Sequence, residues 1–132
     1  MKRILLAVGF ALSFPAFACG VCIDDKVASC YDHAVISEAH KRGHAVAFFA
    51  IEGELVRSAE TRKAISSAIE KTRGVRRGTA RVSLENAALS FAYDPGRSSA
   101  KDAGSAVARA LADRRLELKL LRVLHRYEHL DR

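Results

Sequence analysis

The sequence predicts an α+β domain in which strands and helices follow one another in the order β-α-β-β-α-β, behind an N-terminal helix. Two kinds of periodicity predict this order. In the segments 61–73 and 99–111, apolar residues recur every three or four positions, the spacing of one face of a helix. In the segments 78–94 and 115–123, apolar and polar residues alternate, the spacing of one face of a strand.

The first helix and the first strand are predicted from neighbouring segments. Apolar residues at helical spacing span 25–42, and Gly43 stands where that helix would end. The run "AVAFFAI" (45–51) is apolar throughout and rich in strand formers, so we expect a largely buried strand.

A loop, a second helix and a hairpin follow. The loop is "GELVRSA" (53–59), in which Ser58 is a candidate N-cap, and the helix after it would end at Gly74. Alternation on both sides of "ENA" predicts a hairpin with one buried face. The residues expected on that face are Ala80, Val82, Leu84, Leu89, Phe91 and Tyr93.

The last helix and strand complete the domain. Ser99, with Asp102 three residues on, forms a near capping box for the helix. The residues expected on the half-buried side of the last strand are Leu116, Leu118 and Leu120. This order of elements is the ferredoxin-like arrangement, with two helices on one face of an antiparallel sheet, and the one-sided strands predict that the other face is open.

The first 18 residues have the anatomy of a secretory signal peptide. "MKR" is a positive segment, "ILLAVGFALSF" is an apolar run, and "PAFA" ends in an A-x-A pattern. The apolar run is well below the roughly 20 residues of a transmembrane helix. We therefore expect a signal peptide over 1–18, cleavage after Ala18, and a periplasmic or secreted protein that is not transmembrane.

Cleavage at this point would make Cys19 the first residue of the mature chain. That position also fits a lipoprotein anchored through an acylated Cys19, although the usual lipoprotein pattern has Leu three residues earlier, where this chain has Ala16. Acylation would remove one thiol from the CxxC motif that begins there.

The composition excludes several classes of protein. Among 132 residues, 22 Lys and Arg against 15 Asp and Glu give a formal net charge of +7, and Trp is absent. The basic residues are scattered among acidic ones, as on a solvated surface, and exported proteins do not normally meet nucleic acid. We expect one small domain that does not bind nucleic acid. We also expect no enzyme, because no nucleophile–base pair, phosphate loop or carboxylate pair stands out.

Residues 45–124 resemble a heavy-metal-associated (HMA) domain. The likeness rests on Gly74-Val75 after the helix, on the alternating strand around Val82, and on the strand end "FAYDP". It implies a ferredoxin-like fold. In that family a G-M-T-C-x-x-C loop holds Cu(I) or another soft metal ion. The matching loop here is "GELVRSA", with Val56 and Ala59 at the positions of the two cysteines.

All three cysteines precede that domain, in the segment 19–44. Cys19 and Cys22 form a CxxC, and Cys30 and His33 follow with the same spacing. These four residues resemble the ligand set of a small zinc or copper site, to which a free N-terminal amine would add a nitrogen. We therefore predict an exported carrier or scavenger of copper or zinc.

Three alternatives stay open. Cys30 shares an apolar helix face with Val27 and Tyr31, which is also typical of a buried small hydrophobe. Cys19 and Cys22 would serve equally as a disulfide, and "CGVC" resembles the "CGPC" of thioredoxins, which favours a thiol–disulfide protein. The third alternative is a non-catalytic interaction module that binds a partner protein.

The histidines add little. "HRYEH", in the C-terminal tail 125–132, matches the H-x-x-E-H pattern of some metalloproteases, but only three residues follow it and we treat the match as chance. We expect His40 and His44 to be exposed surface residues separated by Gly43.

Overall fold

The computed structural model describes the backbone of residues 19–125 and the side chains of residues 23–125. The signal segment 1–18 and most of the tail 125–132 lie outside these limits. In chain order the elements are α1 (Cys19–Ser29), α2 (His33–Lys41), β1 (Ala45–Gly53), α3 (Ala59–Lys71), β2 (Arg81–Ser83), β3 (Ala88–Tyr93), α4 (Ala100–Ala110), the short 3-10 helix η1 (Ala112–Arg114) and β4 (Leu116–Leu124). Within this range, none of the helices has the length and apolar character needed to cross a membrane.

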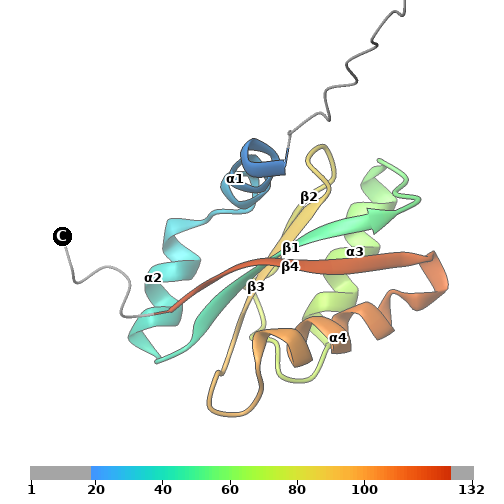
Figure 1. Ribbon diagram of the computed structural model, residues 1–132. Helices are drawn as coiled ribbons and strands as arrows, with labels where there is room; N and C mark the ends of the chain where they lie inside the picture. Colours follow the sequence, from blue (N-terminus) through green and yellow to red (C-terminus); the bar gives the residue numbers. More distant parts are fainter. Residues whose placement is uncertain (1–18, 126–132) are drawn as a thin grey trace, which may run out of the picture.

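The sheet confirms the predicted fold. Its strand order in the described chain is β2-β3-β1-β4, and all neighbours are antiparallel. From β1 to β4 the elements run β-α-β-β-α-β, so the architecture is ferredoxin-like. Figure 1 shows α3 and α4 together on one side of the sheet, with α1 and α2 on the other.

The face under α3 and α4 carries the larger hydrophobic core. Phe49 of β1 stacks on Phe91 of β3 with ring centroids 5.3 Å apart. Ile65 of α3 and Val107 of α4 are fully buried against them. Gly104 lets α4 approach closely, since a Cβ at this position would lie 2.4 Å from the Phe49 ring. We call this set of buried residues the first core.

The opposite face is covered, and the prediction that it is open was wrong. Val46 and Phe48 of β1 are buried there against Val27 of α1 and Ile36 of α2, in what we call the second core. On β3 this face carries Ala88, Ser90 and Ala92, all buried. In the sequence, small residues of this kind are compatible with a solvent-exposed face. They also let a helix pack directly on the sheet, as it does here.

The predicted single helix over 25–42 is two helices. The break lies between Ser29 and His33, where Asp32 has extended backbone angles and its carboxylate accepts hydrogen bonds from the N–H groups of Ala34 (2.9 Å) and Val35 (3.3 Å). This is an N-cap, which satisfies the orphan donors of a new helix. Apolar spacing continues across the break, so periodicity did not reveal it. The helix α2 ends at Lys41 before Gly43 (φ +72°), as predicted.

The prediction that Leu120 is half-buried was also wrong. The pairing of β1 with β4 shifts register between Phe48 and Phe49, so that Phe49 faces Leu120 while Phe48 faces Arg122. Leu121 is the extra residue of this irregularity, as in a β-bulge. The strand turns there, and Leu120 is left 41% exposed.

Candidate metal centre

The CxxC motif lies in the first turn of α1. Cys19 is the first residue of the helix and Cys22 follows three residues later. Residues three apart on a helix lie on the same face, so this backbone suits two ligands of one ion or the two ends of a short disulfide. The side chains of both cysteines lie outside the described residues, and their use as ligands stays a prediction.

Polar contacts fasten α1 to the sheet. The Lys26 ammonium donates to the backbone carbonyls of Asn86 and, at 3.3 Å, Ala87, both in the loop between β2 and β3. On another side of the helix, Asp24 accepts a hydrogen bond of 3.0 Å from Arg122 of β4. These contacts, together with buried Val27, fix the helix that carries the CxxC at the hairpin end of the sheet.

The loop "GELVRSA" (53–59) lies at the same end. Arg57 donates from Nε to the carbonyl of Leu84, 3.1 Å away, where the β2–β3 hairpin begins its turn. Figure 1 shows α1 and this loop on either side of the hairpin. The loop contains no cysteine and so offers no sulfur to a metal ion. Val56, at one of the two cysteine positions, is 65% exposed, and Ala59, at the other, begins α3. The CxxC helix and this loop therefore both contact the β2–β3 hairpin, from opposite sides of it.

Cys30 lies away from solvent, at the end of α1. It is 3% exposed and packs in the second core with Ile36, Ala39 and Phe48. Burial raises the pKa of its thiol, partly opposed by the Ser29 hydroxyl 3.8 Å from Sγ. Because the thiolate is the metal-binding form, this environment disfavours coordination and favours the alternative of a buried small hydrophobe.

His33, in contrast to Cys30, lies in an exposed environment. It is the exposed first residue of α2, and its Nε2 lies 3.3 Å from the hydroxyl of Ser37 one turn on. The helix break separates it from Cys30. Within the described part of the chain, no three His, Cys, Asp or Glu side chains lie close enough together to hold a metal ion. The structure thus does not join Cys30 and His33 into one described cluster.

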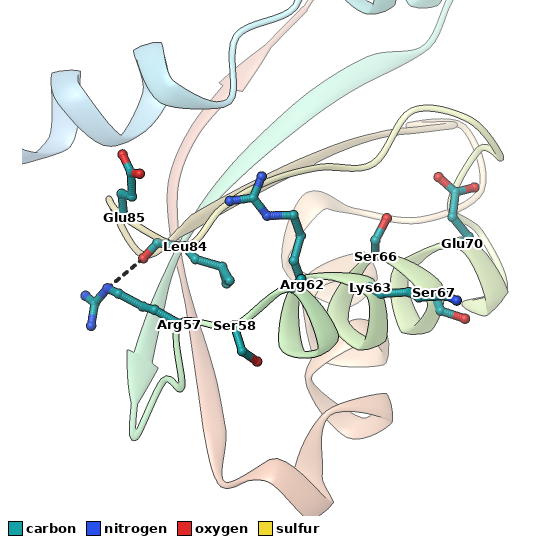
Figure 2. Close-up of a pocket in the computed structure, with 10 residues that line it drawn as sticks. Arg57, Ser58, Arg62, Lys63, Ser66, Ser67, Glu70, Leu84 and Glu85 are labelled. Carbon is teal, nitrogen blue, oxygen red and sulfur yellow. Dashed lines mark hydrogen bonds between the residues drawn. The ribbon is translucent and has the colours of Figure 1, made fainter.

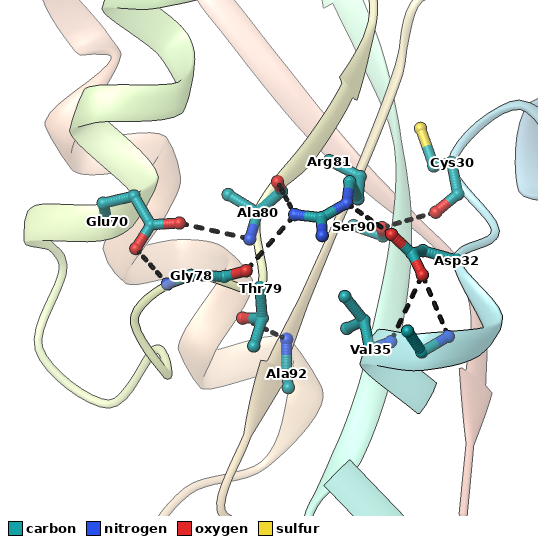
Figure 3. A network of polar contacts seen from close by, with 11 residues as sticks. Cys30, Asp32, Val35, Glu70, Gly78, Thr79, Ala80, Arg81, Ser90 and Ala92 are labelled. Atoms are coloured by element: carbon teal, nitrogen blue, oxygen red, sulfur yellow. Dashed lines mark hydrogen bonds and ion pairs between the residues drawn. The ribbon is translucent and has the colours of Figure 1, made fainter. Parts of the chain in front are cut away.

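A polar network that the sequence did not predict holds the α1–α2 turn on the sheet (Figure 3). Arg81 of β2 donates from Nε to Asp32 at 2.9 Å, and its Nη1 donates to the carbonyls of Gly78 and Ala80. The Ser90 hydroxyl donates to the carbonyl of Cys30 at 3.0 Å. Hydrogen bonding to Arg81, followed by the Val35 N–H, lowers the pKa of Asp32 below its usual range.

Asp32 and Arg81 are separated by 49 residues, so no local spacing could have paired them. The only signal available was the Asp itself, a residue type that favours helix N-caps. His40 and His44 also differ from the prediction: both are half-buried rather than exposed, because α2 lies against the sheet.

Comparison with known proteins finds similar solved structures at low sequence identity. No protein-family model matches the chain, and no curated protein matches it. The chain is similar to the crystal structure of a copper-binding domain from HMA7, a P-type ATPase, with 18% identity over 60% of this chain and 96% of that one, at a TM-score of 0.48. It is also similar to oxidized MerP from Ralstonia metallidurans CH34, with 19% identity over 60% of this chain and 99% of that one, at a TM-score of 0.47.

The ferredoxin-like fold expected from the sequence is confirmed by the order and pairing of the strands. The two helices α1 and α2, which carry the CxxC, precede the βαββαβ unit.

Proposed function

We propose that the protein is exported and binds a soft metal ion, copper or zinc, through Cys19 and Cys22, as a carrier or scavenger rather than an enzyme. The observation that carries the proposal is the position of α1. Its first turn holds the CxxC, and Lys26 fastens it to the same hairpin that Arg57 of the sulfur-free loop contacts. The helix that carries the CxxC is thus held at the hairpin end of the fold, the end that it shares with the sulfur-free loop.

The number of ligands favours Cu(I) over zinc. A structural zinc ion takes four ligands in a tetrahedron. The described residues offer the CxxC pair no third sulfur or imidazole, since Cys30 is buried in the second core and His33 belongs to the next helix. A soft monovalent ion that thiolates select over oxygen and nitrogen suits such a pair better.

A titration of the reduced, exported protein with Cu(I) against a competing chelator tests the proposal. We expect one ion per chain in the wild type and none retained by the variant Cys19→Ser/Cys22→Ser. Cys30→Ala is the matched control, because it removes a cysteine from the second core and is expected to bind as the wild type does. Equal binding by the wild type and the double variant would refute the proposal.

Intact-mass analysis of the exported protein determines which state Cys19 is in. A signal-cleaved chain with both thiols reduced is the form that binds metal. A mass increased by acyl chains identifies a lipoprotein anchored through Cys19, which leaves Cys22 as the remaining thiol of the pair.

A second candidate is a thiol–disulfide protein that uses the same pair. The observation in its favour is that α1 begins at Cys19, because a helix N-terminus lowers the pKa of a thiol placed there and makes it a better nucleophile. It predicts disulfide exchange with a small model disulfide that Cys19→Ser abolishes. Exchange without Cu(I) retention would favour this candidate over the metal carrier.

A further inference from the structure

A groove runs along α3, on the side of the sheet opposite to the CxxC helix. Its volume is about 830 Å³, and Figure 2 shows Arg62, Ser66 and Glu70 projecting from one side of α3 toward β2. Arg57 and Glu85 stand at the end nearer the hairpin. From Ser58 to Glu70 the helix covers about 18 Å, at about 1.5 Å per residue. An extended chain of about five residues, at about 3.3 Å each, matches this length.

The groove borders the unpaired edge of the sheet. β2 is the terminal strand in the described sheet, with β3 on its only paired side. Arg81 and Ser83 pair with Ser90 and Ala88 of β3. Even-numbered residues of β3 direct their backbone groups toward the β2 side, since Ala92 N–H donates to Thr79 there. In an antiparallel ladder this places the N–H and C=O of Val82 on the outer edge.

The two residues whose backbone groups flank those of Val82 on that edge, Ala80 and Leu84, already have hydrogen-bond partners from the groove lining. At the start of β2, Glu70 accepts a hydrogen bond of 3.2 Å from the N–H of Ala80. At its end, Arg57 donates to the carbonyl of Leu84. Within residues 19–125 the outward groups of Val82 have no such partner. The edge therefore offers one donor and one acceptor to an added strand, between two fixed ends.

The lining of the groove carries three cations, Arg57, Arg62 and Lys63, against the two carboxylates of Glu70 and Glu85. Arg62 and Lys63 make no ion pair within the described residues, and Arg57 is held by a carbonyl rather than a carboxylate. The carboxylate of Glu70 is turned to the backbone, where it also accepts from the Gly78 N–H at 2.7 Å. The side chains of α3 thus present uncompensated cations beside an unpaired strand edge.

We propose that this groove binds an extended acidic peptide segment of a partner protein, which adds as a strand to β2 at Val82 and places carboxylates on Arg62 and Lys63. In a known mode of peptide recognition, an extended peptide forms main-chain hydrogen bonds to a sheet edge, and neighbouring side chains select its sequence. A second copy of this chain fits less well, because pairing two β2 edges would bring the same cations together. The proposal is independent of the CxxC and of any metal.

The test is fluorescence anisotropy of a labelled six-residue peptide of alternating Glu and Val, titrated with the purified full-length protein. We expect saturable binding that weakens with salt, and no binding of the same peptide with Lys in place of Glu. Arg62→Gln/Lys63→Gln should weaken binding about tenfold or more, as expected for two charge-assisted contacts. Lys101→Gln/Arg109→Gln, which removes two exposed cations from α4, should leave binding unchanged.

The strand edge has its own test. Val82→Pro removes the outward N–H without breaking the ladder to β3 and should abolish peptide binding, while Val82→Thr should retain it. If Val82→Pro does not fold, exchange of the Val82 amide in the wild type answers the same question, and it should slow when the peptide is added. An unchanged exchange rate, equal loss in the α4 control, or self-association in place of peptide binding would each overturn the proposal.

Discussion

The face of the sheet under α3 and α4 and the face under α1 and α2 are closed in different ways. In the first core, α3 and α4 pack on large side chains, and the Phe49–Phe91 stack lies against Gly104. In the second core, α1 and α2 cover smaller residues of β3. The contacts Asp32–Arg81, Asp24–Arg122 and Lys26–Asn86 tie them to the sheet at the margins.

The difference shows how a small fold carries an added site. The first core accounts for the βαββαβ unit by itself, whereas α1 and α2 are attached to its second face by fewer buried side chains and more polar contacts. We infer that the attached layer is the less stable of the two, because exposed ion pairs contribute little and buried apolar area contributes most.

The largest expected effect comes from the neighbours Phe48 and Phe49, which point to opposite cores. Phe49→Ala should lower the free energy of unfolding by about 4–5 kcal/mol and Phe48→Ala by about 3 kcal/mol, the upper and lower parts of the range for such changes. The reason is that α1 and α2, which are held to the sheet by fewer buried side chains, can move into the space that Phe48 leaves behind. Urea unfolding followed by far-UV circular dichroism measures both.

If either Ala variant fails to fold, Phe49→Leu and Phe48→Leu repeat the comparison with smaller cavities. A cost for Phe48 equal to or above that for Phe49 would contradict the ranking of the two faces.

A change at Gly104 should have an intermediate effect on the first core alone. An added methyl would meet the Phe49 ring at 2.4 Å, and overpacking of this kind costs about 1–3 kcal/mol. Without that contact, Gly→Ala inside a helix would stabilise by about 1 kcal/mol. Thermal unfolding of Gly104→Ala beside Ser105→Ala, an exposed position on the same helix, tests this. A melting temperature above that of the wild type would show that the approach of α4 is looser than described.

A smaller effect concerns the buried thiol of the second core. In Cys19→Ser/Cys22→Ser, which leaves Cys30 as the single cysteine, iodoacetamide should react on the order of tenfold or more slowly in buffer than in urea, because the folded state shields the thiol. Burial raises the pKa of Cys30, so the neutral thiol favours folding at neutral pH, and that stability is lost as the pH rises past the thiol's ordinary value. Equal rates in buffer and urea would show that α1 leaves the sheet freely.

The smallest effect is the pH dependence of the Asp32–Arg81 contact. Arg81 lowers the pKa of Asp32, so its contribution to stability is fully present above the ordinary carboxyl pKa and is lost as the pH falls through that value toward the lowered one. Asp32→Asn keeps a capping side chain but removes the charge. The difference in melting temperature between the wild type and Asp32→Asn should therefore shrink from pH 6 to about pH 3, a range that spans the ordinary value of about 3.9. A difference in melting temperature that stays constant over this pH range would exclude the Asp32–Arg81 contact as its cause.

The first core could be predicted from the sequence because each of its elements carries its own signal. Ser58 and Ser99 cap α3 and α4 as expected, by accepting hydrogen bonds from the N–H groups of Thr61 and Asp102. Alternation around "ENA" located β2 and β3, and the apolar run at 45–51 located β1. Local propensity and periodicity agree there with the tertiary structure.

The second core could not be predicted because its determinants are distant or ambiguous. Ala88, Ser90 and Ala92 are equally suited to water and to a closely packed helix. Arg81 reaches Asp32 across the sheet, and the shift at Phe48 and Phe49 depends on pairing with β4. Of the four predicted ligands, Cys30 is a buried residue of the second core, His33 is exposed on α2, and the use of Cys19 and Cys22 as ligands stays a prediction.

X-ray absorption spectroscopy at the copper edge of the Cu(I)-loaded, exported protein tests the central claim most directly. The account predicts sulfur scatterers contributed by Cys19 and Cys22, with a spectrum unchanged in Cys30→Ala. A first shell made only of nitrogen or oxygen, or a sulfur contribution lost in Cys30→Ala, would contradict it.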